Sequence, residues 1–121
     1  KFIASNADTT LPTERGPVLG NGAILAALQA ATKIPPTVIG KPEAIMYQQA
    51  INILGIPADK TIAIGDRLNT DILGAVNTGI RSIMVLTGIS NEDDLLSIDY
   101  KPTWILPDLA AITDALRVAN N

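Results

Sequence analysis

The sequence contains no cysteine and no histidine, and only 3% of its residues are aromatic. Without cysteine there are no disulfides and no thiol nucleophile, and without histidine there is no imidazole for acid–base catalysis. The usual zinc sites depend on the same two residue types. A bound metal would therefore be a hard cation such as magnesium, held by oxygen atoms.

Basic runs and long apolar runs are also absent. The net charge is −3 and no stretch is rich in lysine or arginine, so we do not expect a nucleic-acid partner. No apolar stretch approaches the roughly 18 residues that a membrane-spanning helix needs, and no signal peptide is visible. We therefore expect no membrane association and a cytoplasmic protein.

The composition that is present is typical of a globular chain. Apolar residues make up 47% of the 121 residues and charged residues 17%, which is enough for one domain with a core. The sequence begins with Lys1 rather than methionine, and Phe2-Ile3-Ala4 has the character of a strand already under way. We therefore expect a piece of a longer chain.

Apolar strands and helices alternate along most of the sequence. Strands are expected at residues 2–4, 37–39, 61–65, 81–86 and 103–106. Helices are expected at residues 23–32, 42–54, 70–77, 92–97 and from Asp108 to about residue 118, with a loop at residues 9–20. This order predicts an α/β fold whose parallel sheet is covered by helices on both faces. Proline and glycine cluster at residues 34–40 and predict a boundary between residues 1–38 and 39–121.

Two carboxylates flank the turn at residues 65–72. The apolar strand stops at Gly65-Asp66, and Asp71 lies in the first turn of the helix that follows. An acid at the end of a buried strand and a second acid in the next helix suit a hard cation. If the strands are parallel, Lys41 after the strand at residues 37–39 lies at the same edge of the sheet. A lysine beside two carboxylates fits phosphate chemistry.

Each of these residues also has a structural explanation. Asp66 could serve only as a turn residue, and Asp71 could serve only as a partner of the helix dipole. Lys41 could be a surface lysine. Arg67 could bind an anion or remain solvated.

Several segments match a known family. Gly40-Lys41-Pro42, the segment Gly65-Asp66-Arg67-Leu68-Asn69-Thr70-Asp71-Ile72, and residues 75–81 and 85–88 resemble the haloacid dehalogenase (HAD) superfamily. More narrowly, they resemble its NagD-like, para-nitrophenylphosphatase-like branch with a type-II cap. Residues 1–38 are similar to the end of that cap domain, and residues 39–121 to the C-terminal half of the Rossmann-like core.

The resemblance implies a magnesium-dependent phosphatase that hydrolyses a small phosphate ester through an aspartyl-phosphate intermediate. By position, Lys41 matches the lysine that contacts the phosphate and stabilises its charge. Asp66 matches the acid that binds magnesium, and Asp71 matches the acid that supports it. Asn6 and Asp8 match the part of the cap that faces the active site and selects the substrate.

One departure from the family pattern is large. The Asp-x-Asp motif that supplies the nucleophile and the acid does not occur in these residues, and neither does the motif of the phosphate-binding serine or threonine. The resemblance therefore implies the C-terminal part of such an enzyme, inactive alone. Its expected partners are a small phosphorylated metabolite and the N-terminal half of the same protein. The resemblance also makes a homodimer an expected assembly.

Two other functions compete with this one. The chain could be a non-catalytic α/β module for binding or assembly that retains the cation site. It could also be a phosphoacceptor receiver domain that is modified on Asp66. The receiver hypothesis is the weaker, because receivers carry their lysine after a later strand, whereas Lys41 precedes Asp66.

Overall fold

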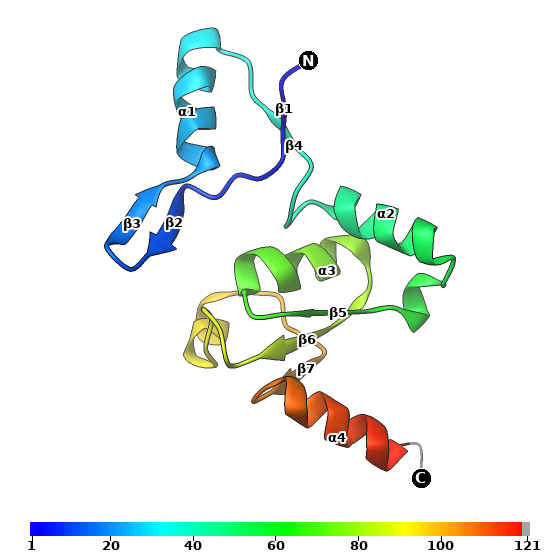
Figure 1. Ribbon diagram of the computed structural model, residues 1–121. Helices are drawn as coiled ribbons and strands as arrows, with labels where there is room; N and C mark the ends of the chain where they lie inside the picture. The colour runs from blue at the N-terminus through cyan, green and yellow to red at the C-terminus, as the bar shows by residue number, and fades with distance from the viewer. Residues whose placement is uncertain (120–121) are drawn as a thin grey trace.

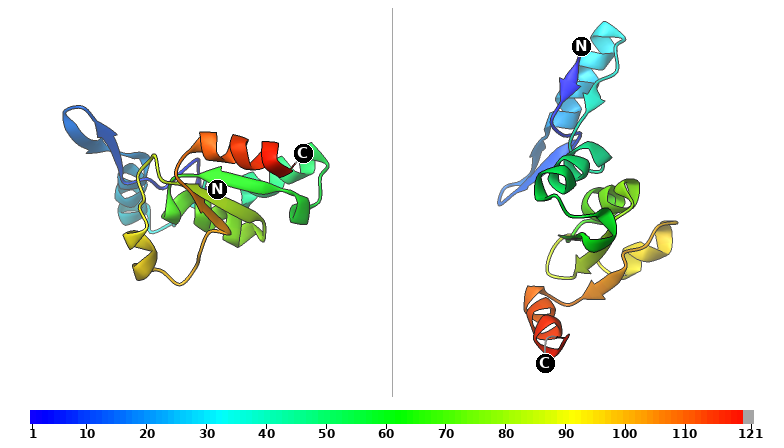
Figure 2. Two further views of the ribbon diagram at one scale, coloured as in Figure 1. Left: turned by 90° about the horizontal axis from the view of Figure 1, so that it is seen from below. Right: turned by 90° about the vertical axis from the view of Figure 1, so that its right-hand side faces the viewer.

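The computed structural model describes residues 1–119. Over these residues the chain has an α/β fold with parallel strand pairing (Figure 1), which confirms the predicted class. The chain is elongated, with the N-terminal part at one end and the last helix at the other (Figure 2). No helix in the described part of the chain is both long enough and apolar enough to cross a membrane.

The N-terminal part is built on a short parallel pair of strands. Strand β1 (Ile3–Ala4) pairs with β4 (Thr37–Val38). Between them lie the antiparallel hairpin of β2 (Thr10–Thr13) and β3 (Gly16–Leu19), and then helix α1 (Asn21–Thr32). The division predicted at residue 38 falls at the end of β4 and stays a prediction.

The loop predicted at residues 9–20 is wrong, because these residues form the β2–β3 hairpin. Pro12 and Pro17 lie opposite each other in its register. Both strands of a two-stranded ribbon are edge strands, so a proline there need not interrupt a hydrogen-bonded ladder. Gly16 has a φ of 105°, which suits glycine, and its carbonyl oxygen accepts a hydrogen bond of 2.7 Å from the Thr13 hydroxyl.

The C-terminal part is a three-stranded parallel sheet in the order β5 (Ile62–Gly65), β6 (Arg81–Val85) and β7 (Trp104–Leu106). Residues 37–39 were expected to share this sheet, and that expectation is wrong because β4 pairs with β1 instead. Helices α2 (Ala44–Leu54) and α3 (Leu73–Thr78) lie on one face, and α4 (Leu109–Ala119) lies on the other (Figure 1).

The buried core lies between the sheet and the α2–α3 face. Its most enclosed apolar side chains are Ile72, Ala75 and Met84, each with 0% of its surface exposed. Local sequence features fix the ends of the flanking helices. Gly79 ends α3 in a left-handed conformation, and the Asp108 carboxylate accepts the N–H of Ala111 at 2.8 Å at the start of α4. The Gly79 cap thus ends α3, the helix that follows the turn carrying the site.

Candidate functional site

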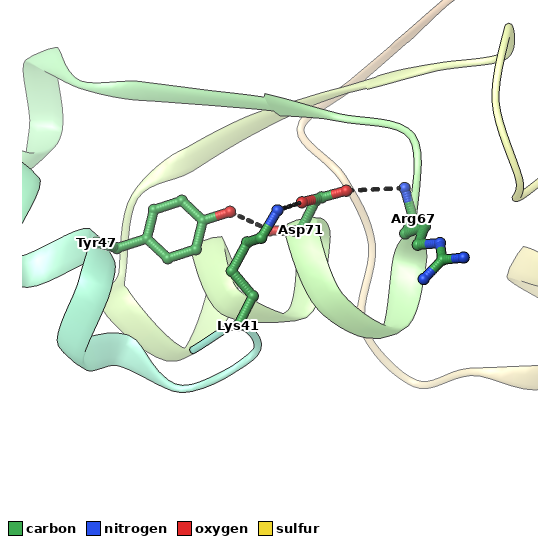
Figure 3. Close-up of polar contacts among 4 residues, drawn as sticks. All are labelled: Lys41, Tyr47, Arg67 and Asp71. Carbon is green, nitrogen blue, oxygen red and sulfur yellow. Dashed lines mark hydrogen bonds and ion pairs between the residues drawn. The ribbon is translucent and has the colours of Figure 1, made fainter. Parts of the chain in front are cut away.

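The candidate site lies at the carboxyl end of β5, where the chain turns into α3. Asp66 directly follows the last residue of β5, and Asp71 lies in the π-helical turn Leu68–Ile72 that precedes α3. Lys41 reaches the same place from the connection between β4 and α2. Its Nζ lies 2.6 Å from Oδ1 of Asp71 (Figure 3). The lysine and the second carboxylate therefore meet although β4 does not belong to the β5 sheet.

Asp71 is a buried carboxylate whose two oxygens both accept hydrogen bonds. Oδ1 accepts from Lys41, and Oδ2 accepts from the backbone N–H of Arg67 at 3.1 Å. The hydroxyl of Tyr47 donates to the backbone carbonyl of Asp71 at 3.0 Å. Only glycine fits at Gly65, since a Cβ there would overlap the Asp71 side chain. These contacts fix Asp71, and Asp71 in turn fixes the ammonium group of Lys41.

The turn that presents Asp71 has an unusual hydrogen-bond pattern. The N–H groups of Asp71 and Ile72 both donate to the carbonyl of Arg67, at 3.0 and 3.1 Å. The N–H of Leu68 donates to the hydroxyl of Ser90 at 3.1 Å. Single π-helical turns of this kind occur often at functional sites. The loop after β6 thus supports the turn that carries the carboxylate.

The charge states of the site follow from this geometry. The hydrogen bond to Asp71 raises the pKa of Lys41, and the charge of Asp66 adds a smaller effect in the same direction. Partial burial of Lys41 opposes the rise without cancelling it. Burial also raises the pKa of Tyr47, and the charge of Asp71 adds to that rise. At neutral pH, Lys41 is positively charged and Tyr47 keeps its donor proton.

Asp66 is held by the loop after β6. Its Oδ2 accepts the N–H of Ile89 at 2.9 Å, and its backbone carbonyl accepts the N–H of Ser90 at 3.1 Å. The loop passes so close that a Cβ on Gly88 would overlap the Asp66 carboxylate. Among the hydrogen bonds of residues 1–119, Asp66 uses Oδ2 and leaves Oδ1 available.

These oxygens fit part of a magnesium site. Residues 1–119 contain no group of three or more acidic, histidine or cysteine residues that could enclose a metal ion. Magnesium at phosphate sites keeps several waters and uses one or two protein carboxylates, which the free Oδ1 of Asp66 can provide. Asp71 is less available, because Lys41 and the Arg67 N–H occupy its oxygens. The assignment of Asp66 and Asp71 to a metal stays a prediction.

A cavity of about 240 Å³ joins the N-terminal part to this site. Its lining includes all five residues that the sequence singled out: Asn6, Asp8, Lys41, Asp66 and Asp71. Hydrogen bonds hold Asn6 in place on the cavity wall. Its side-chain Oδ1 accepts the N–H of Asp8 at 3.2 Å, and its backbone carbonyl accepts a hydrogen bond from the Asn21 side-chain amide at 2.7 Å. The proposed substrate contacts of Asn6 and Asp8 stay predictions.

The sequence did not single out every residue that shapes the site. Tyr47 lies on α2, 24 residues from its partner Asp71, and no local pattern marks such a contact. Thr70 also lines the cavity, and so does Arg67, for which the sequence left anion binding open. The spacing within residues 66–71 could have indicated Thr70 as well, because one turn presents all of these residues.

Gly40→Ala is expected to disturb the junction between the two parts of the chain. A Cβ on Gly40 would overlap the backbone carbonyl of Ser5, and backbone cannot move aside as a side chain can. We expect a loss of about 1–3 kcal/mol in the free energy of unfolding, measured in urea. The amide NMR signals of Ser5 and Lys41 should shift as well.

Gly55→Ala is the matched control for this substitution. Gly55 has a φ of 65°, and no atom lies within 4 Å of the position that an alanine methyl group would take, so alanine there adds backbone strain alone. The Gly55→Ala variant should have a lower free energy of unfolding, and the amide NMR signals of Ser5 and Lys41 should stay unshifted. Unshifted signals in Gly40→Ala would contradict the proposed crowding.

Comparisons with known families and proteins agree on one family over most of the chain. A family model described as HAD-hydrolase-like matches residues 38–112. An acid sugar phosphatase of Staphylococcus epidermidis is 41% identical over 109 residues, which is 90% of this chain and 42% of that protein. A 5′-nucleotidase of Bacillus subtilis is 37% identical over 109 residues, 90% of this chain and 43% of that protein.

Solved structures show the same relationship. A p-nitrophenyl phosphatase from Archaeoglobus fulgidus superposes with a TM-score of 0.87 at 31% identity, over 95% of this chain and 46% of its own. A glycerol phosphate phosphatase from Mycobacterium tuberculosis, solved in complex with magnesium, gives a TM-score of 0.84 at 42% identity, over 90% of this chain and 33% of its own. The chain thus spans less than half the length of each of these four proteins.

Proposed function

This chain belongs to the HAD-hydrolase-like family, and from that premise we propose that it forms part of a magnesium-dependent phosphatase acting on a small phosphorylated metabolite. The observation that carries the proposal is the meeting of Lys41 with Asp71 and Asp66 in one cavity. Relatives named as phosphatases support it. Positive charge beside carboxylates that can hold a cation is the arrangement that phosphoryl transfer needs.

Lys41 is the group that we assign to the phosphate. Its side chain is 43% exposed, so it faces the cavity while it pairs with Asp71. An ammonium group has three donors, and the bond to Asp71 uses one of them. The other two can donate to phosphate oxygens. Asp71 acts through Lys41 and is therefore a positioning residue.

Asp66 is the residue that we assign to magnesium. The bound ion would neutralise charge on the phosphate oxygens. The Ile89 N–H fixes one oxygen of Asp66 and so orients the carboxylate. The other oxygen would then be free to bind the ion. Asn6 and Asp8 line the same cavity and would contact the substrate there.

The nucleophile must come from outside the described residues. Within this sequence no Asp-x-Asp motif occurs, and more than half the length of the relatives has no counterpart here. We assign the nucleophile and the acid to that N-terminal half. An aspartate oxygen there would attack phosphorus while the acid protonates the departing oxygen, and water would then hydrolyse the aspartyl-phosphate. This chain alone is expected to be inactive.

One edge of the main sheet supports a docking place for that N-terminal half. Strand β5 pairs only with β6 among the described residues, so its other edge is open. Ile62 and Ile64 on this strand are 42% and 49% exposed, and Met46 on α2 is 51% exposed. An open edge beside exposed apolar side chains favours the addition of a strand. We assign this surface to the N-terminal half, since a strand there would end next to Lys41 and Asp66.

The test is phosphate release from 4-nitrophenyl phosphate with magnesium, by the complete protein and by this chain alone. The complete protein should be active, EDTA should abolish turnover, and Asp66→Asn should lower kcat by on the order of 10²-fold. Asp114→Asn, at an exposed position on α4, serves as the control. Turnover by this chain alone that Asp66→Ala abolishes would contradict the assignment of the nucleophile.

A further inference from the structure

Lys41 and Asp71 are brought together by more than their own ion pair. Within residues 1–119, three side-chain hydrogen bonds join the segment around the start of α2 to the turn and helix that follow β5. One of them is the Lys41–Asp71 contact at 2.6 Å. The other two, from Tyr47 and Asn77, end on backbone carbonyl oxygens and involve no charged group. They can therefore hold the two backbones together while the ammonium group of Lys41 also binds a ligand.

Tyr47 reaches from α2 to the turn that carries Asp71. Its hydroxyl donates to the backbone carbonyl of Asp71 at 3.0 Å (Figure 3). Its half-buried ring lies against Gly74 in α3, so closely that a Cβ on this glycine would overlap the edge of the ring. The missing side chain at Gly74 thus lets α2 and α3 approach closely enough for the hydroxyl to reach its acceptor.

Asn77 makes the reverse connection, from α3 to the segment before α2. Its side-chain amide donates to the backbone carbonyl of Pro42 at 2.9 Å. Pro42 directly follows Lys41, and the N–H of Glu43 donates to the carbonyl of Gly40 at 3.0 Å, so this segment is a tight turn. The hydrogen bond from Asn77 therefore anchors the turn from which the lysine side chain extends.

The two bonds run in opposite directions between the same two parts of the chain, so together they restrict how the backbone of Lys41 moves relative to Asp71. We propose that Tyr47 and Asn77 are positioning residues, which set the place of the Lys41 ammonium group before a phosphate binds. Neither lines the cavity that holds Lys41, so neither would touch the phosphate. This inference rests on the proposed function and adds the residues on which the placement of its lysine depends.

The expected effect follows from how a fixed charge acts. A donor that is already in place stabilises developing charge without rearrangement. A displacement on the order of 1 Å, caused by a change away from the reacting atoms, can lower a rate by about 10²-fold. Loss of one of two anchoring bonds should displace the lysine less than this. A moderate loss of activity is therefore expected from each.

The experiment measures hydrolysis of 4-nitrophenyl phosphate by the complete protein. Tyr47→Phe keeps the ring against Gly74 and removes the hydroxyl, whereas Asn77→Ala removes the amide. Each is expected to lower kcat/KM by about five- to tenfold. Thr78→Val is the matched control, because it removes a hydroxyl bond of 2.7 Å to the carbonyl of Gly74 within α3 and leaves the connection to α2 intact. It should retain full activity.

The same two substitutions in a Lys41→Met background separate positioning from a general structural role. With no ammonium group left to place, Tyr47→Phe and Asn77→Ala should each change kcat/KM by less than about twofold. A loss that is equally large with and without the lysine overturns the proposal, because it would not act through Lys41. Full activity of either single variant overturns it as well.

Failure of the proposed function gives a different result. If the unsubstituted protein does not hydrolyse the ester, or if Lys41→Met alone retains full activity, the role assigned to the lysine is wrong and the inference falls with it. Activity that depends on Lys41 but not on Tyr47 or Asn77 overturns the positioning role alone. A loss in both variants that disappears in the Lys41→Met background supports the function and the inference together.

Discussion

Lys41→Met in the complete protein is expected to lower kcat/KM for 4-nitrophenyl phosphate by on the order of 10²–10³-fold. Methionine keeps an unbranched side chain that is one atom shorter, and it removes the positive charge that we assign to the phosphate oxygens. Loss of one preorganised donor to a developing charge has an effect of this size. Asp71 would also lose its partner at 2.6 Å. The measurement is steady-state hydrolysis with saturating magnesium.

Lys60→Met is the control for this substitution, since Lys60 is exposed in a short 3-10 turn before β5 and does not line the cavity. It should retain full activity. Retention of more than a tenth of the activity by Lys41→Met would contradict the role of the lysine.

The pH dependence follows from the same contact. Asp71 raises the pKa of Lys41 above its ordinary value of 10.5. A raised pKa means that the charged form is favoured in the folded protein, and that this charge is lost only as the pH rises through the new value. The kcat/KM profile should therefore show no loss due to Lys41 below about pH 10.

Asp71→Ala is expected to lower the free energy of unfolding by about 2–3 kcal/mol. The substitution leaves the Lys41 ammonium and the N–H of Arg67 without their acceptor. It also empties the space beside Gly65 that the carboxylate fills. The part-buried N–H of Arg67 would lose its acceptor, and a buried donor left without a partner costs more than its hydrogen bond contributed. Water can replace part of the contact that Lys41 loses, because its side chain is 43% exposed. Urea unfolding of the two proteins side by side measures the difference.

Asp114→Ala is the matched control. Asp114 also accepts a bond from a cation, Arg117 at 3.4 Å, but both side chains are more than 70% exposed. An exposed ion pair contributes little, so its loss should change stability by less than about 0.5 kcal/mol. Asp71→Asn should fall between the two, since an amide oxygen can still accept the Arg67 N–H. An equal loss of unfolding free energy in Asp71→Ala and Asp114→Ala would contradict the structural role of Asp71.

The turn from Asp66 to Asp71 could be predicted from sequence because everything that forms it is local. An apolar strand, a glycine and two acids five residues apart lie in one short segment. The predicted start of the following helix at Thr70 is less accurate, because the helical conformation begins with the π-helical turn at Leu68. Its geometry depends on the Ser90 hydroxyl from the loop after β6, which no local pattern reveals.

The pairing of β4 with β1 could not be predicted from the sequence. Residues 37–39 have the pattern of one more strand of the main sheet, yet β4 is hydrogen-bonded to β1, more than 30 residues earlier. Lys41 nevertheless reaches Asp71, because the connection from β4 to α2 passes the end of β5. The hairpin at residues 10–19 was missed for a different reason. Proline argues against a strand only where its missing N–H is needed, and in an isolated ribbon it is not.

The neighbouring positions of β1 and β4 make the segment between them an exchangeable module. The chain leaves at Ala4 and returns at Thr37 on the adjacent strand, so the two ends of the segment lie together. Inserts with adjoining ends can vary in length at little entropic cost. A different segment could be grafted there while Lys41 stays in register with Asp71. The graft would have to retain Gly40, because only glycine allows the returning chain to pass the carbonyl of Ser5.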